Sequence, residues 1–177
     1  MTRFDDLTRA QAEAVLEGHV AGLPASLARL SDRTARSGGP LWALDASVDQ
    51  ALPAVWGWFL AQQHALDVAW EGADLPWWAE FDQGFCARFS PQLLWDVDGL
   101  AAVLCRHVLE AVPDATWAVG EGQDYVWHNQ PVLRVRGGDV NPLHVVQTAV
   151  HKVVIGGQLG ARDQLLRRYE RWVGRPR

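Results

Sequence analysis

Four polar side chains near residue 150 have types and spacing that could do chemistry. His144, Gln147, Thr148 and His151 recur at i, i+3, i+4 and i+7, so they share one face of a predicted helix. Two helical turns separate the histidines by about 10.5 Å, which is too far for this pair alone to chelate one metal ion. No cysteine and histidine spacing of the zinc-site kind occurs in the chain. The sequence therefore predicts no metal site and no cofactor, and the alternative is a polar surface.

Two of the other histidines, His107 and His128, suggest a core position and a pocket position. His107 lies one turn from Glu110 near the apolar face of its helix, which predicts a core histidine with a hydrogen-bond partner. His128 stands at the end of a predicted strand. A pocket between sheet and helices would be marked by two or more histidines meeting a carboxylate in a concave site. Its candidate lining residues are Trp117, Trp127, His128, Arg134 and His151.

Familiar catalytic motifs are absent. The pairs Gly137-Gly138 and Gly156-Gly157 lack the strand-to-helix context and the lysine of a phosphate-binding loop. No serine stands in a nucleophile elbow. The sequence thus assigns no catalytic residue and favours a protein that is not an enzyme.

Residues 67–82 combine five acids with three tryptophans. Exposed tryptophans among acids could anchor a basic protein partner, stack on a sugar or hold a cationic ligand. The alternative is that Trp77, Trp78 and Phe81 pack inward as a helix stripe. The candidate partner-binding residues are Trp70, Glu71, Asp74, Trp77, Trp78 and Glu80.

Charge is distributed unevenly along the chain. Residues 1–133 hold 18 acids and 7 bases, and residues 134–177 hold 3 acids and 9 bases, which gives a net charge of −5 overall. The two parts could neutralise each other, or an acidic face could steer a basic partner. Immunity and antitoxin-like proteins that mask a basic toxin are one concrete form of such an interaction module. An acidic body disfavours nucleic-acid binding.

Composition indicates a globular protein of the cytoplasm. The 177 residues are enough for a single domain, here 1–177, with its own core. No apolar run is long enough for a membrane span, and residues 1–6 do not resemble a signal peptide. Cys86 and Cys105 stand in apolar surroundings, as expected of reduced, buried thiols. Ten tryptophans would favour a homodimer if several were exposed.

The element order predicts an α+β fold. Apolar spacing indicates two helices before Gly38, broken at residues 18–24, and a helix capped by Asp49 with Pro53 in its first turn. Further helices are expected over about 77–89, from about 96 to 111, from Asn141 to about 155, and at the C-terminal end. Short strands are expected at 115–119, 125–128 and 132–136, with a turn at 137–139, and residues 41–44 could form another. We expect N-terminal helices, a small antiparallel sheet of three to four strands, and C-terminal helices packed on it.

Scattered segments resemble an uncharacterised family of small actinobacterial proteins. The resemblance covers about residues 40–172 and implies a shared fold. This family carries Gly-Glu where the chain has Arg106-His107, so an activity that needs that glutamate is not expected here. The matching features are Leu44-Asp45-Ala46-Ser47 followed by Leu52, Val55 and Trp56; the helix end at 104–109; Trp117; Pro131-Val132-Leu133; Asn141-Pro142; and the closing basic helix.

Overall fold

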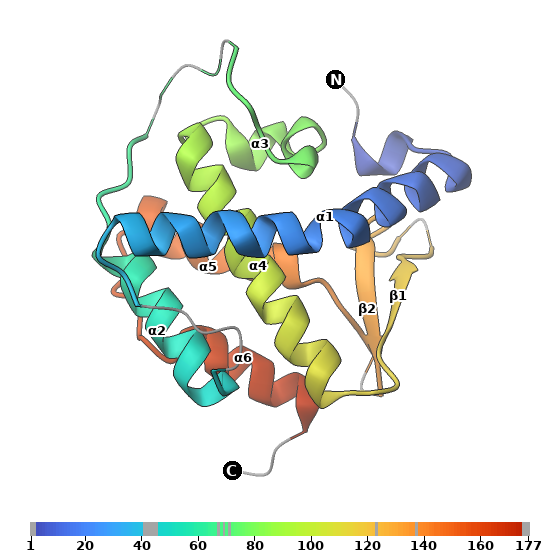
Figure 1. Cartoon of the computed structure of the whole chain (residues 1–177). Coiled ribbons are helices and arrows are strands. Elements are labelled where there is room, and N and C mark those ends of the chain that lie inside the picture. The colour runs from blue at the N-terminus through green and yellow to red at the C-terminus, as the bar shows by residue number, and fades with distance from the viewer. Residues whose placement is uncertain are drawn as a thin grey trace.

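The computed structural model describes residues 3–40, 46–66, 68, 70, 72–122, 124–136 and 138–174. Helices come first, a small sheet follows, and two helices close the chain (Figure 1), which confirms the predicted α+β architecture. The α-helices are α1 (Arg9–Arg36), α2 (Val48–Ala61), α3 (Gln83–Cys86), α4 (Pro91–Ala111), α5 (Pro142–Val150) and α6 (Gln164–Val173). The strands are β1 (Thr116–Val119), β2 (Pro131–Val135) and β3 (Gly138–Val140). Two 3-10 turns, η1 (Phe4–Asp6) and η2 (Trp77–Glu80), and a π-helical turn, η3 (His151–Ile155), complete the set.

Helix α4 is the centre of the fold. Ser90 caps its N-terminus by accepting a hydrogen bond from the Leu93 amide, and Pro91 occupies the first helical position, where its missing N–H costs little. The helix runs behind α1 in Figure 1 and contacts α1, α2, α5 and α6. Because other helices surround it, most of its residues are buried and its apolar side chains form the middle of the core.

The part of the chain before Gly38 holds one long helix where two were expected. Helix α1 begins after Thr8, whose hydroxyl accepts from the Gln11 amide, and continues through residues 18–24. Pro24 lies inside it on the exposed side, where water can replace the hydrogen bond that proline cannot donate. Helix α2 also starts earlier than predicted, after Ser47 and not after Asp49, so Pro53 is likewise an interior residue.

The sheet has three antiparallel strands in the order β1-β2-β3, and Leu133 in the middle strand pairs with Trp117 and Val140. The strand expected at 125–128 is wrong. These residues form turns that lead to Asn129, whose φ is 58°. The third strand is β3, in a segment where a turn was expected. The apolar run at 41–44 lies outside the described residues.

Helix α5 starts as the sequence predicts. The side-chain oxygen of Asn141 accepts a hydrogen bond from the His144 amide, and Pro142 follows at the first helical position. After Val150 the turn widens, because the amide of Gly156 donates to the carbonyl of His151, five residues earlier. None of the helices in the described part of the chain is long and apolar enough to cross a bilayer.

Candidate functional site

An open groove of about 290 Å³ lies between α3 and α5. One side comes from the N-terminal end of α3, and the other comes from a single face of α5 and its π-helical extension. That face is the polar face expected from the sequence at residues 144–151. The lining side chains are Asp82, Phe85, His144, Gln147, Thr148, His151 and Lys152.

Asp82 supplies a carboxylate that is fixed from two sides. One oxygen caps α3 by accepting from the Phe85 amide at 3.3 Å. The other accepts from the side-chain nitrogen of Gln147 at 3.1 Å, and Gln147 is itself buried. This hydrogen bond joins α5 to a residue 65 positions earlier in the chain. The carboxylate is therefore held in place before any ligand arrives.

His144 stands beside this carboxylate in the first turn of α5. Its ring meets the edge of Trp127 with centroids 6.0 Å apart, and its Nε2 lies 3.5 Å from the Thr148 hydroxyl. Partial burial lowers the pKa of His144, while the Asp82 carboxylate acts in the opposite direction. Near neutral pH the ring is thus uncharged and can both donate and accept a hydrogen bond.

The far end of the groove carries its cationic group. His151 and Lys152 are both exposed and open the π-helical turn. His144 and His151 therefore line the same open groove as the Asp82 carboxylate, and His144 is the one whose pKa this carboxylate affects. This groove lies between helices, whereas the sequence predicts a pocket between the sheet and the helices.

The other predicted pocket residues lie elsewhere. Trp117 packs its ring on His19 with centroids 4.9 Å apart. Trp127 reaches the groove only by its contact with His144. His128 is half-buried, with a buried Nδ1 that has no hydrogen-bond partner within the described chain, and Arg134 is exposed and paired with Glu121 and Asp139.

The core interpretation of His107 matches the structure. This side chain is 3 % exposed, and its Nδ1 lies 3.2 Å from the Glu110 carboxylate. Burial and the neighbouring Arg106 lower its pKa, against the opposing effect of Glu110.

Tryptophans of residues 70–82 face largely inward. Trp78 is fully buried and donates its indole N–H to Asp98 at 3.0 Å, so it is not available to a partner at the surface. Trp70 is half-buried and donates to the Phe89 carbonyl at 2.8 Å. Trp77 is half-buried and packs against Phe4 and His19.

Acidic residues of the same segment remain at the surface. Asp74 and Glu80 are exposed, and Asp74 lies 3.2 Å from Arg29 in an ion pair. Glu71 lies outside the described residues. Within the described ranges, no three histidine, cysteine or acidic side chains gather in a way that could hold a metal ion.

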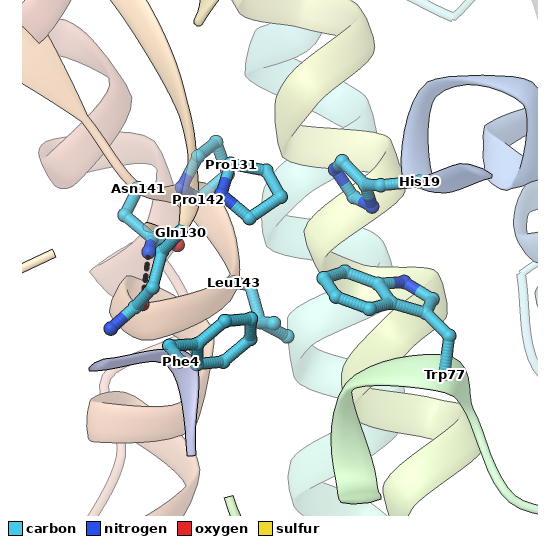
Figure 2. A pocket seen from close by; sticks show the side chains of 8 residues that line it. All are labelled: Phe4, His19, Trp77, Gln130, Pro131, Asn141, Pro142 and Leu143. Atoms are coloured by element: carbon cyan, nitrogen blue, oxygen red, sulfur yellow. Dashed lines mark hydrogen bonds between the residues drawn. The ribbon is translucent and has the colours of Figure 1, made fainter. Parts of the chain in front are cut away.

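A second cavity lies among residues of η1, α1, η2, β2 and the first turn of α5 (Figure 2). It measures about 10 Å³, the size of a single water molecule. Sequence reasoning missed most of this lining, Phe4 and His19 included, and it missed Asp82, Phe85 and Lys152 in the groove. No periodicity marks Phe4, His19 and Asp82, because each reaches its site only through long-range packing. The lining residues are Phe4, His19, Trp77, Gln130, Pro131, Asn141, Pro142 and Leu143.

No protein-family model, curated protein or solved structure matches this chain.

Proposed function

We propose that this protein binds a small polar ligand in the groove between α3 and α5. One observation carries the proposal: a fixed carboxylate, Asp82, and two histidines, His144 on α5 and His151 at the start of η3, line the same concave site. A hydrophobic side chain, Phe85, forms part of the wall. Concave sites with a few converging polar groups are where proteins usually bind small molecules.

The arrangement favours a ligand that carries an anionic group and a hydrogen-bond donor. Lys152 can neutralise the anionic group, and His151 can donate to it. Asp82 accepts from the donor, and the neutral His144 ring beside it can accept or donate in turn. Amino acids and small hydroxy acids have this chemistry.

The test is a titration of the labelled protein with amino acids, hydroxy acids and simple sugars, followed by amide NMR. A ligand should shift the amides of residues 144–152. Asp82→Asn should weaken its binding about tenfold, since asparagine still caps α3 but has lost the charge. The matched control is Asp163→Asn, at the N-cap of α6, which should bind as the unchanged protein does. If no compound shifts these amides, or if Asp82→Asn binds normally, the proposal is wrong.

Binding of a basic protein by the acidic surface is the second candidate. Phe4 and Phe81 stack with centroids 4.8 Å apart, and their sequence neighbours Asp5 and Glu80 are both exposed. Two acids beside one aromatic pair favour a cationic partner, and the free, buried thiols of Cys86 and Cys105 agree with a place in the cytoplasm.

A pull-down at low and high salt tests this second candidate. A basic protein should be retained at low salt, lost at high salt, and lost at low salt from Glu80→Lys. Asp124→Lys, at another exposed acid, should retain it. Light scattering would reveal whether the partner is a second copy of the chain. If a protein is retained equally at low and high salt, and equally by the Glu80→Lys variant, this second candidate is wrong.

A further inference from the structure

We propose that η1 is a lid over an aromatic pocket, and that the pocket takes a neutral aromatic ligand with a hydrogen-bonding group, whose ring replaces that of Phe4. This site is separate from the α3–α5 groove and does not depend on the function proposed there. Figure 2 shows the Phe4 ring beside the cavity, with His19 and Trp77 facing it.

The lid is a short segment with few anchors. Phe4 comes from a single 3-10 turn and is 9 % exposed. Its ring stacks on Phe81 with centroids 4.8 Å apart and meets Trp77 edge-on at 6.2 Å. A second anchor is the side-chain nitrogen of Asn129, which donates to the Leu7 carbonyl at 2.8 Å. Withdrawal of one ring and rupture of one hydrogen bond would release the turn while α1 keeps its packing on α4.

The space under the lid is bounded by rigid walls. Trp77 comes from η2, Pro131 from the start of β2, and Pro142 and Leu143 from the first turn of α5. With Phe4 in place the cavity measures about 10 Å³. Withdrawal of Phe4 would add the volume of a phenyl ring, and an aromatic ligand would restore the contacts with Phe81 and Trp77.

His19 supplies a largely buried imidazole ring beside the cavity. The ring is 8 % exposed and contacts Trp77 and Trp117, with centroids 5.2 Å and 4.9 Å away. The ring also lines the cavity. A ligand hydroxyl placed there could form a hydrogen bond with a ring nitrogen of His19.

Neighbouring amides add to the polar side of the pocket. The side-chain nitrogen of Asn141 donates to Gln130 Oε1 at 2.9 Å, and Asn141 Oδ1 accepts from the His144 amide. Asn141 is thereby held in place, while the Gln130 carboxamide nitrogen keeps its donors for a ligand.

The charge of the pocket selects the ligand class. None of the eight lining residues is a lysine, arginine, aspartate or glutamate. Burial lowers the pKa of His19 to about 4, so this ring is also uncharged near pH 7. A charged ligand would lose its hydration without gaining a counter-ion. Phenols are therefore the class that fits, because they join a phenyl ring to one neutral donor and acceptor.

The experiment measures phenol and toluene binding by calorimetry and by the NMR signal of the Trp77 indole N–H. Phe4→Ala should bind phenol about tenfold more tightly than the unchanged chain, because the pocket no longer has to expel its own ring. Leu166→Ala is the matched control: it shortens a half-buried side chain on α6, away from the cavity, and should bind phenol as the unchanged chain does.

Two further variants keep the test decisive. Asn129→Gly suits the positive φ at this position, removes the bond to Leu7 and leaves Phe4 in place; it should also tighten phenol binding. In the Phe4→Ala background, phenol should bind about tenfold more tightly than toluene, and His19→Leu should abolish that difference. The proposal that η1 is a lid is wrong if the Phe4→Ala and Asn129→Gly chains are folded but bind phenol no better than Leu166→Ala. Equal binding of phenol and toluene would overturn the role of His19.

Discussion

Two buried carboxylates on α4, Asp96 and Asp98, face towards α1. Asp96 is 3 % exposed; it accepts from the Gln92 side chain at 3.0 Å, and Arg33 lies 3.8 Å away. Burial raises the pKa of Asp96 to about 6 because these partners compensate only part of the lost hydration. Burial also raises the pKa of Asp98, against the hydrogen bonds from Ser26 and Trp78.

The raised pKa of Asp96 predicts how the free energy of unfolding depends on pH. The folded chain keeps a proton on Asp96 up to about pH 6, whereas the unfolded chain releases it near pH 4. The contribution of Asp96 to the free energy of unfolding therefore falls as pH rises between these values and stays low above them. Asp96→Asn should raise the unfolding free energy at pH 8 by up to about 3 kcal/mol and change it little at pH 4.

Urea unfolding of both chains at the two pH values provides the measurement. Asp32→Asn serves as the control, because Asp32 is an exposed acid on α1 and should give no pH-dependent gain. A gain for Asp96→Asn of equal size at both pH values would contradict the explanation by ionisation.

At the scale of elements, the contact between α1 and α4 depends on Gly99. A Cβ at this position would come 2.6 Å from the Leu30 Cβ, which is too close for either helix to stay where it is. Gly99→Ala should thus destabilise the fold by about 1–3 kcal/mol, although alanine is the better helix former.

Thermal or urea unfolding of two further chains checks this contact. Gly84→Ala on α3 is the matched control, because its Cβ would meet nothing within 4 Å, and it should stabilise the protein slightly. Leu30→Gly removes the Cβ that would clash, so its combination with Gly99→Ala should cost less than the sum of the two single changes. Full additivity would show that the two helices do not meet at this point.

Elements with strong local signals could be predicted, and those decided by packing could not. Asn141 and Pro142 fix the start of α5 through their own backbone chemistry, so the sequence is sufficient there. Pro24 has the local character of a helix breaker, yet α1 continues because its buried face packs along α4. Tyr125 and Trp127 favour a strand by type, but a turn precedes Asn129 and no partner strand pairs with them in the described sheet.

Only one side of the groove could be predicted from the sequence. Helical spacing places His144 and His151 on one face of α5 and its π-helical extension without any knowledge of the fold. The carboxylate that completes the site, Asp82, comes from a distant segment and reaches α5 through Gln147. The sequence contains no local relation between these positions, so only the tertiary structure brings them together.

At the scale of the whole molecule, its two thiols report on global unfolding. Cys86 and Cys105 are free and buried, and burial raises the pKa of both, so neither forms a thiolate in the folded chain near neutral pH. We expect no reaction with a thiol reagent such as Ellman's reagent under native conditions, and two reacting groups per chain in denaturant.

The reaction rate across a urea series is the measurement, and it should follow the unfolding transition. Leu159→Cys provides a positive control, because residue 159 is fully exposed and should react at once. Fast labelling of Cys86 or Cys105 in the unchanged chain without denaturant would mean that the core opens locally.

Charge is partly balanced within the molecule. Two arginines of the basic C-terminal part pair with acids of the N-terminal part: Arg134 with Glu121 at 3.6 Å and Arg136 with Asp114 at 3.0 Å. These exposed pairs contribute little to stability, but they reduce the acidic field near the sheet. The unbalanced negative charge is then found on other faces, among them the one that carries Asp5 and Glu80.

The wide turn η3 has a consequence for how this chain can change in length. A π-helical turn holds one residue more than the α-helical turn it replaces, so it amounts to an insertion that the helix has absorbed. Deleting Val154 would allow an ordinary α-helical turn to form but would rotate everything beyond it by about 100°. Gly156 and Gly157 follow at once and could absorb that rotation before α6 begins. Lys152 precedes the deleted residue and would keep its place next to the end of α5. A change of chain length at this turn could thus alter the C-terminal helix α6 without altering the groove, and the two parts can change independently.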